Sequence, residues 1–190
     1  MINKIINMAT EPRLKIKYRD NIVPEMKKKF GYQNDLAVPK LEKAVVAVGL
    51  SQGLKDPKFS EIAGDTLERI TGQKPVKTKA KKSISNFKIR KGMPVGMIVT
   101  LRGKRMYDFI DKLINISLPR ARDFRGLSPK FLDKDGNLSV GFRENICFPE
   151  IRSDEIGKIH GLQITVKTTA RSREEGLELL KLFGFPFQRD

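Results

Sequence analysis

The stretch from Gly72 to Gly92 constrains this chain most, because it carries many cations and no acid. No Asp or Glu occurs between Glu68 and Asp108, and that interval holds twelve of the chain's 38 Lys and Arg residues. The net charge is +16, so this interval supplies most of it. Such clustering indicates a polyanionic partner, because each neutralised phosphate releases condensed counterions. The alternative is a solvated basic loop that only keeps the protein soluble, but such a surface mixes both signs.

Length and composition favour one globular domain. The chain has 190 residues, of which 39% are hydrophobic, enough to fill a core. We expect one domain, or one domain with an excursion. No apolar run approaches the roughly 20 residues that span a bilayer, and the first residues lack a signal-peptide core. We therefore expect a cytoplasmic protein with no membrane partner.

Metal and cofactor chemistry have little support in the sequence. Cys147 is the only cysteine and lies between apolar residues, so a buried hydrophobic role is expected, without a disulfide or a cysteine-based zinc site. His160 is the only histidine, and alone it cannot build a histidine metal site. We expect no catalytic residue, no metal site and no cofactor.

Apolar periodicity predicts four helices. They cover residues 13–30, 57–71, 104–117 and 173–183. Pro24 either kinks the first helix or delays its start, and Pro119 is expected to end the third. Asp56-Pro57 is a typical helix start, and Ser172 opens a capping box with Glu175.

Short β-branched runs predict strands at residues 44–48, 96–102, 138–142 and 162–169. The basic stretch is predicted to hold two extended arms, one with Val76 and Thr78 and one with Phe87 and Ile89. A long mobile loop joins them, and long loops within a domain are usually functional. Because no helix separates these β segments from the next, we expect an α+β fold. Its mostly antiparallel sheet would carry helices on one face and leave the other face free for a ligand.

Several short motifs occur in a recognisable order. They are Gly72-Gln-Lys-Pro75, Thr78-Lys-Ala-Lys-Lys-Ser83, Phe87-Lys-Ile-Arg90, Thr100-Leu-Arg-Gly103, Leu118-Pro-Arg120, Arg122-Asp-Phe-Arg-Gly-Leu-Ser128, Phe148-Pro-Glu-Ile151 and Phe185-Pro-Phe187. From about Arg13 to its end, the chain resembles the bacterial-type large-subunit ribosomal protein "L-five", the family that binds 5S ribosomal RNA. The resemblance implies a single RNA-binding domain over residues 13–190 and leaves residues 1–12 as a short extension, which we expect to be flexible. The ordered set is specific, although no single motif decides. The resemblance implies a curved antiparallel sheet with helices on one face and a long basic loop that protrudes.

The resemblance also implies the partners. They are 5S ribosomal RNA, large-subunit ribosomal RNA, neighbouring proteins of the central protuberance, transfer RNA in the peptidyl site, and a protein of the small-subunit head. A chain of this kind is a structural constituent of the large ribosomal subunit and not an enzyme.

Three groups of residues carry these contacts over to this chain. The 5S RNA group is Lys43, Gln73, Lys74 and Thr100. The transfer RNA group lies in the loop and is Lys77, Thr78, Lys79, Lys81, Lys82, Ser83 and Lys88. The intersubunit bridge group is Arg120, Arg122, Asp123, Arg125 and Arg143. Cations, amides and hydroxyls suit phosphates, 2′-hydroxyls and base edges. Lys43 and Thr100 could equally be ordinary strand-surface residues.

Two details qualify the resemblance. The family often has a polar Asn where this chain has Ala47, and Gly49-Leu-Ser-Gln-Gly53 replaces the usual Gly-Val-Gly-Glu, which puts the individual hydrogen bonds to 5S RNA in question. Phe87 is the one aromatic residue of the loop. We interpret it as a core anchor near the loop's base, because binders of single strands present several aromatic rings.

Two rival classes explain less of the sequence. An RNA-processing enzyme needs acid–base or metal chemistry, which one histidine, one cysteine and an acid-free basic zone do not favour. A non-specific nucleic-acid-binding or DNA-compacting protein would explain the charge, but not the ordered motifs.

Overall fold

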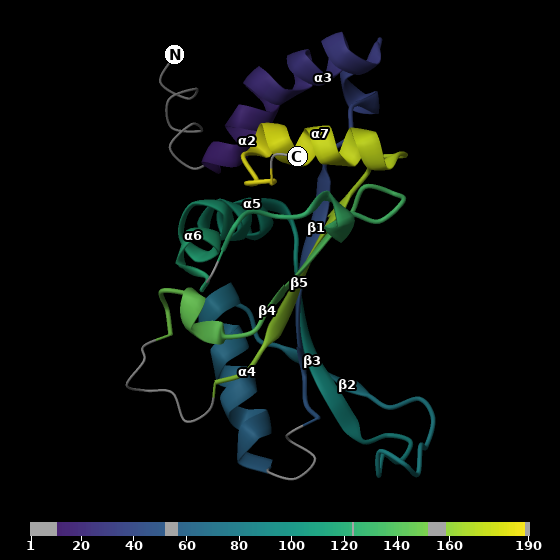
Figure 1. The fold of residues 1–190 in the computed structure, drawn as a ribbon, viewed down its shortest axis with the longest axis vertical. Coiled ribbons are helices and arrows are strands. Elements are labelled where there is room, and N and C mark those ends of the chain that lie inside the picture. Colours follow the sequence, from purple (N-terminus) through teal and green to yellow (C-terminus); the bar gives the residue numbers. More distant parts are fainter. Residues whose placement is uncertain (1–10, 52–56, 123, 152–158, 189–190) are drawn as a thin grey trace.

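A five-stranded antiparallel sheet runs through the middle of the computed structural model, which describes residues 11–51, 57–122, 124–151 and 159–188 (Figure 1). Its strand order is β2-β3-β1-β5-β4, and every neighbouring pair is antiparallel. The strands are β1 (Leu41–Gly49), β2 (Val76–Lys79), β3 (Pro94–Leu101), β4 (Leu138–Phe142) and β5 (Leu162–Thr168). Together with the helices, this sheet confirms the predicted α+β class.

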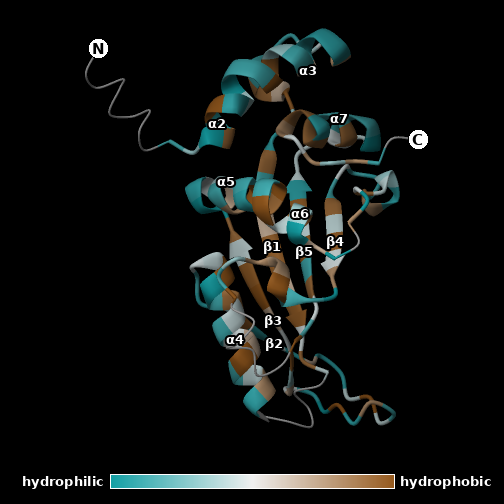
Figure 2. Cartoon of the chain, turned by 60° about the vertical axis from the view of Figure 1, so that its left-hand side comes forward, coloured by the Kyte–Doolittle hydropathy of each residue, from teal (hydrophilic) through white to brown (hydrophobic). Residues whose placement is uncertain are grey.

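The helices cover one face of the sheet and one of its ends. They are α2 (Arg13–Lys17), α3 (Val23–Phe30), α4 (Pro57–Thr71), α5 (Gly103–Lys112), α6 (Leu118–Arg120) and α7 (Arg173–Phe183). α4 packs on β3 and α5 packs on β1. α2, α3 and α7 gather beyond one end of the sheet, at the top of Figures 1 and 2. No helix of the described residues covers the opposite face of the sheet, which we call the open face.

Burial alternates along the strands and separates the two faces. In β1, Ala44, Val46 and Val48 are at most 3% exposed, whereas their neighbours Lys43 and Val45 are partly exposed. Successive strand residues point to opposite faces, so the buried set meets the helices and the polar set faces outward. Full burial of a valine side chain such as Val46 stabilises the fold by about 1.5–3 kcal/mol. Burial of one set of side chains therefore fixes which residues of each strand lie on the opposite face.

Two prolines lie within continuous helical segments. Each follows a wide π-turn, η1 (Tyr18–Ile22) before Pro24 and η4 (Leu113–Ser117) before Pro119. The N–H groups of Val23 and Leu118 bond to carbonyls five residues back. A proline removes one N–H and crowds the carbonyl four residues back, and a wider turn relieves that crowding. The helix over residues 13–30 is thus confirmed with a widened turn, while the prediction that Pro119 ends its helix is wrong.

The predicted helix ends are largely confirmed. Gly72 and Gly184 follow α4 and α7 with φ of 65° and 105°, the left-handed conformation that favours glycine. The Ser172 hydroxyl accepts a hydrogen bond from the Glu175 N–H at 3.2 Å, as a cap should. Asp56, the predicted cap of α4, lies outside the described residues.

Cys147 is buried, as predicted, with an exposed fraction of 6%, and His160 is buried as well, at 5%. Burial raises the pKa of the Cys147 thiol to about 11, so it stays protonated at neutral pH. The His160 ring packs edge-on against Phe59, with 5.6 Å between ring centroids. Among the described residues, no group of three His, Cys, Asp or Glu side chains could hold a metal ion. Within that same part of the chain, the helices are too short or too polar to cross a membrane.

Candidate nucleic-acid interface

The basic stretch forms an ordered hairpin that extends β2 and β3. Ala80 N–H bonds to the Met93 carbonyl at 2.8 Å, and Gly92 N–H bonds to the Ala80 carbonyl at 2.9 Å. Further out, Ile84 and Ile89 exchange two backbone hydrogen bonds of 2.9 and 3.1 Å. The sequence predicted a mobile loop here, and that prediction is wrong for the described hairpin. The hairpin is held by backbone hydrogen bonds, which leave no apolar periodicity in the sequence. We call residues 77–92 the basic hairpin.

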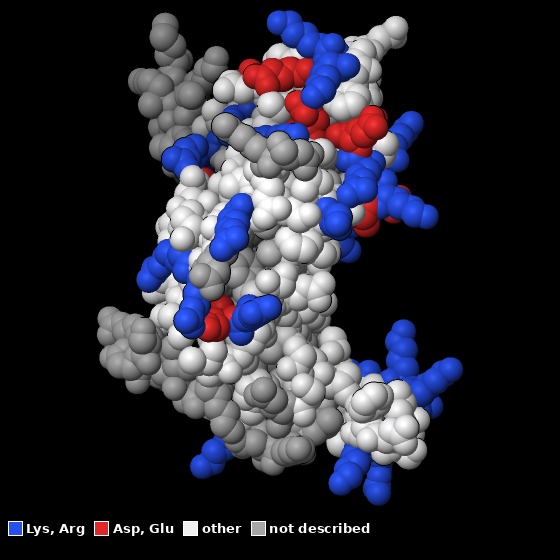
Figure 3. All heavy atoms as spheres, viewed as in Figure 1, with Lys and Arg blue, Asp and Glu red and all other residues white. Residues whose placement is uncertain are grey.

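The basic hairpin stands away from the body of the protein with its cations exposed. Its charged side chains are Lys77, Lys79, Lys81, Lys82, Lys88, Arg90 and Lys91, and all seven are exposed. Figure 3 shows them at the lower right, around an uncharged tip and with no acid beside them. Ser83 accepts a hydrogen bond from the Lys91 N–H at 3.0 Å, so its hydroxyl helps to order the hairpin. This surface can bind phosphates along a backbone.

Phe87 corrects one expectation. It lies at the tip of the basic hairpin and is 68% exposed, so it is not a core anchor. The predicted second arm with Phe87 and Ile89 is also wrong, since β3 begins only at Pro94. The two-residue alternation of Phe87 and Ile89 resembles a strand, but a tight turn over Ser85–Lys88 interrupts it.

The open sheet face brings the predicted 5S RNA residues together. Thr100 pairs with Val45 across β3 and β1, so Lys43 lies diagonally beside it on the same face. Gln73, just before β2, donates its side-chain amide to the Thr100 carbonyl at 3.4 Å. Lys74 follows it and is exposed. The structure thus brings Lys43, Gln73 and Thr100 close together at one end of the sheet.

Further polar residues of the open face were not singled out from the sequence. Thr165 pairs with Val45 from the other side, and its hydroxyl lies 3.1 Å from that of Ser139. Gln163 is exposed two residues earlier. The hydroxyls of Thr165 and Ser139 therefore lie side by side on β5 and β4, and Val45 of β1 separates them from Thr100 on β3. The alternation of polar residues in 162–168 was the signal that could have found them.

A shallow depression lies at the other end of the open face. It is lined by Ala47, Gly49 and Gly96, with Thr78 and Gln163 at its sides. Gly49 is exposed and Ala47 is half-buried, so part of the β1 backbone is accessible here, which suits the close approach of a ligand backbone. Thr78 pairs with Gly96 and faces this depression, so it belongs to the open face as well as to the base of the basic hairpin.

One lysine of the open face, Lys167, is paired with an acidic side chain. Lys167 forms a 2.9 Å ion pair with Glu42. The hydrogen bond from Lys167 lowers the pKa of Glu42 below its ordinary value. Both side chains are more than 40% exposed, so the pair is screened by solvent and contributes little to stability.

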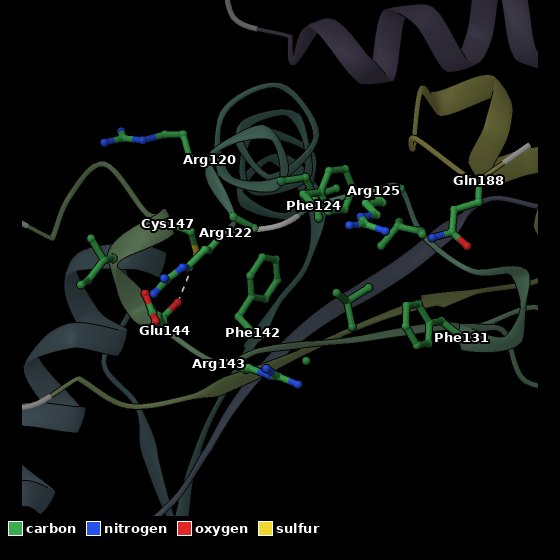
Figure 4. Close-up of a pocket in the computed structure, with 17 residues that line it drawn as sticks. Arg120, Arg122, Phe124, Arg125, Phe131, Phe142, Arg143, Glu144, Cys147 and Gln188 are labelled. Atoms are coloured by element: carbon green, nitrogen blue, oxygen red, sulfur yellow. Dashed lines mark hydrogen bonds between the residues drawn. The ribbon is translucent and has the colours of Figure 1, made fainter.

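Four of the five predicted bridge residues surround a hollow of about 720 Å³ (Figure 4). Arg120 ends α6, Arg122 and Arg125 follow it, and Arg143 follows β4. The aromatic side chains of Phe124, Phe131 and Phe142 line the same hollow. Asp123 lies outside the described residues. We call this hollow the arginine pocket.

Glu144 is the one acidic residue among the described residues of the arginine pocket. Its carbonyl accepts a hydrogen bond from the Cys147 thiol at 3.4 Å (Figure 4). The pocket as described therefore carries more positive than negative charge, and guanidinium groups suit bidentate bonds to carboxylates or phosphates.

Comparisons with known proteins decide the family. A family model of ribosomal protein L5 matches residues 34–90, and a model of the C-terminal part of the same ribosomal family matches residues 94–187. A large ribosomal subunit protein uL5 of Carboxydothermus hydrogenoformans is 55% identical over 178 residues, covering 94% of this chain and 99% of the relative. The chain belongs to the uL5 family. It is therefore a constituent of the large ribosomal subunit, a structural ribosomal protein and not an enzyme.

Other uL5 relatives match as fully. The uL5 protein of Halothermothrix orenii is 54% identical over 172 residues, covering 90% of this chain and 96% of the relative. That of Dictyoglomus thermophilum is 54% identical over 176 residues, covering 93% of this chain and 98% of the relative. The predicted family is confirmed, and with it a place in the ribosome.

Proposed function

We propose that this uL5 chain binds 5S ribosomal RNA through the open face of its sheet and helps to form the central protuberance. The observation that carries the proposal is the meeting of Lys43, Gln73 and Thr100 at one end of that face. They combine a cation, an amide and a hydroxyl, which together can bond phosphates, ribose hydroxyls and base edges. The hydroxyls of Thr165 and Ser139 continue the polar surface.

The basic hairpin has a separate task in this proposal. Its lysines contact transfer RNA in the peptidyl site through the phosphate backbone. Support comes from the seven exposed cations and the absence of acid in this described segment. Contacts to the backbone do not read sequence, so every elongator transfer RNA is accepted alike.

The third contact is a bridge to a protein of the small-subunit head. It is supported by the four arginines that line the arginine pocket, Arg120, Arg122, Arg125 and Arg143. Exchanging Arg122 and Arg143 for Glu should weaken the association of the two subunits and leave 5S RNA binding unchanged. Sedimentation of reconstituted ribosomes measures this, and unchanged association would contradict the bridge.

Gel shifts test the proposed RNA partner. The purified chain is titrated at physiological salt with 5S RNA, an unrelated RNA of equal length and duplex DNA. We expect a strong preference for 5S RNA, because non-specific binding rests on phosphate charge that all three share. Equal affinity for the three would instead indicate a non-specific nucleic-acid binder and contradict the proposal.

A further inference from the structure

Phe87 is the most exposed of the eleven phenylalanines in the chain, at 68%. Most of the others are buried, and Phe131, the next most exposed, stands at 47%. In the described part of the chain, the Phe87 ring has no aromatic or cation–π partner. Leaving the ring in water forfeits the stabilisation that its burial would bring.

The turn presents the ring in a defined way. The Lys88 N–H bonds to the Ser85 carbonyl at 2.9 Å, and the Ile84–Ile89 pair closes the turn behind it. Lys88 has φ of 55°, the one described non-glycine residue with positive φ. A left-handed lysine is strained and persists only where its surroundings impose it. The tip is thus ordered before binding, so a partner has less entropy to overcome.

The surroundings of Phe87 select the chemistry of its partner. Lys81, Lys82, Lys88 and Arg90 are exposed on the same tip, and this segment holds no acid. A partner must combine a flat apolar face with negative charge close beside it. A nucleobase that is unstacked from its neighbours, with its flanking phosphates, has both properties.

We propose that the tip of the basic hairpin is a stacking site for one unstacked base in an RNA loop, with Phe87 covering the face of the base. The neighbouring lysines hold the flanking phosphates. The inference rests on the proposed function, in which the basic hairpin meets RNA. It adds one base contact to the phosphate contacts proposed above, and a stacking contact accepts any base because every base has an aromatic face.

An anionic lipid surface would also offer phosphates beside apolar groups, but the tip favours RNA. Ser85 and Asn86 precede Phe87 in the turn and are exposed with it. Inserting Phe87 into a bilayer would draw these polar groups away from water without partners. Base edges and ribose hydroxyls would instead satisfy them.

The test compares two RNAs with the full-length chain. One is a stem–loop with unpaired loop bases, and the other is a fully paired RNA duplex of the same length. Phe87→Ala should weaken stem–loop binding about 5- to 150-fold, the effect of losing one base stack. Duplex binding and the salt dependence of both affinities should stay as in the wild type, because no charge is removed.

Matched variants separate stacking from charge and from folding. Phe87→Tyr should keep the affinity for the stem–loop, and Phe87→Leu should lose it, since only tyrosine has an aromatic face. The double variant Lys81→Ala/Lys82→Ala should bind both RNAs more weakly, and the slope of log affinity against log salt concentration should fall in magnitude by about 2. Leu36→Ala, which removes an 88% exposed side chain outside the hairpin, should change neither.

Three results would overturn the stacking site. The first is an unchanged affinity of Phe87→Ala for the stem–loop. The second is an equal loss of affinity of Phe87→Ala for the stem–loop and the duplex. The third is that Phe87→Ala loses binding to phosphatidylserine vesicles while its affinity for RNA stays intact. A wild-type chain that prefers 5S RNA but shows no effect of Phe87→Ala contradicts the stacking site alone. A wild-type chain that binds no RNA contradicts the proposed function and this site with it.

Discussion

At the scale of single residues, the position of the Gln73 side chain depends on adjacent residues and on one residue distant in sequence, Thr100. Thr71 accepts the Gln73 N–H at 3.3 Å, and Gly72 turns the chain at φ of 65°. These local features direct Gln73 toward β3, where it reaches the Thr100 carbonyl. The sequence named Gln73 and Thr100 as candidates for the site. It could not predict that contact, because the register of β3 against its neighbours is set by packing across the sheet.

Single substitutions test the open face. Gln73→Ala and Lys43→Ala should each weaken 5S RNA binding by about 1–3 kcal/mol, since each removes one polar contact to the RNA. Lys28→Ala, which removes an exposed charge from α3, is the matched control and should leave binding close to the wild type. Fluorescence titrations measure the affinities. Curves for both site variants that overlay the wild type would refute the site.

Gly176 tests the packing of α7. A Cβ there would lie 2.3 Å from the Gly136 Cα, so Gly176→Ala should destabilise the fold by about 1–3 kcal/mol despite alanine's higher helix propensity. Gly64 in α4 has only ordinary contacts, the nearest being Met97 Sδ at 3.6 Å. Gly64→Ala should therefore stabilise by up to about 1 kcal/mol. Urea midpoints measure both, and a stabilising Gly176→Ala would contradict the contact.

At the scale of elements, the sequence predicted what local patterns determine. The strands and the helix ends follow from alternation, capping residues and glycines such as Gly72 and Gly184. The helix was expected to end at Pro119, but it continues to Arg120 because a π-turn accommodates the proline. The steric relief that this turn gives is not visible in the apolar periodicity of the sequence. Phe87 misled because a four-residue turn gives no apolar repeat. Backbone hydrogen bonding, which residue types do not display, accounts for both errors.

The basic hairpin and the open face should be separable as elements. Changing Lys79, Lys81 and Lys82 to Ala should leave 5S RNA affinity within about tenfold, or 1.4 kcal/mol. The same variant should impair transfer RNA binding in the peptidyl site, measured by filter binding to reconstituted ribosomes. Complete loss of 5S RNA binding would show that the hairpin, and not the sheet, anchors that RNA.

The turn before β4 should respond to pH. The Asp133 carboxylate accepts backbone N–H groups of Asp135 and Asn137 at 3.0 and 2.7 Å. Burial raises the pKa of Asp133, but these bonds and the Asn137 amide lower it by more, so its net pKa lies below 3.8. A carboxyl whose pKa is lower in the folded state stabilises the fold at pH values above its unfolded-state pKa. That contribution is lost as the pH falls through its folded-state pKa.

Asp133→Asn should therefore lower stability at neutral pH and flatten the loss of stability below about pH 4. Thermal melts between about pH 7 and pH 2.5 measure this. The control is Asp135→Asn, which removes a carboxylate of the same turn that accepts none of these bonds. Equal pH profiles for the two variants would show that the Asp133 bonds do not act as described.

At the scale of the whole molecule, the uL5 chain separates its surfaces by chemistry. The core lies between the sheet and the helices, and Figure 2 shows hydrophobic stretches along the strands. The basic hairpin carries cations alone, whereas the upper part of the face in Figure 3 carries charges of both signs. The sequence predicted this charge segregation and the α+β class. The extent of the domain over residues 13–190 stays a prediction, as does a flexible extension, because residues 1–10 lie outside the described part.

The most direct test of the account is a density map of the ribosome that contains this chain. The account predicts 5S RNA density against the open face at Lys43, Gln73 and Thr100, with the basic hairpin directed toward the peptidyl-site transfer RNA. Density of 5S RNA against the helices instead, with the open face uncovered, would contradict it.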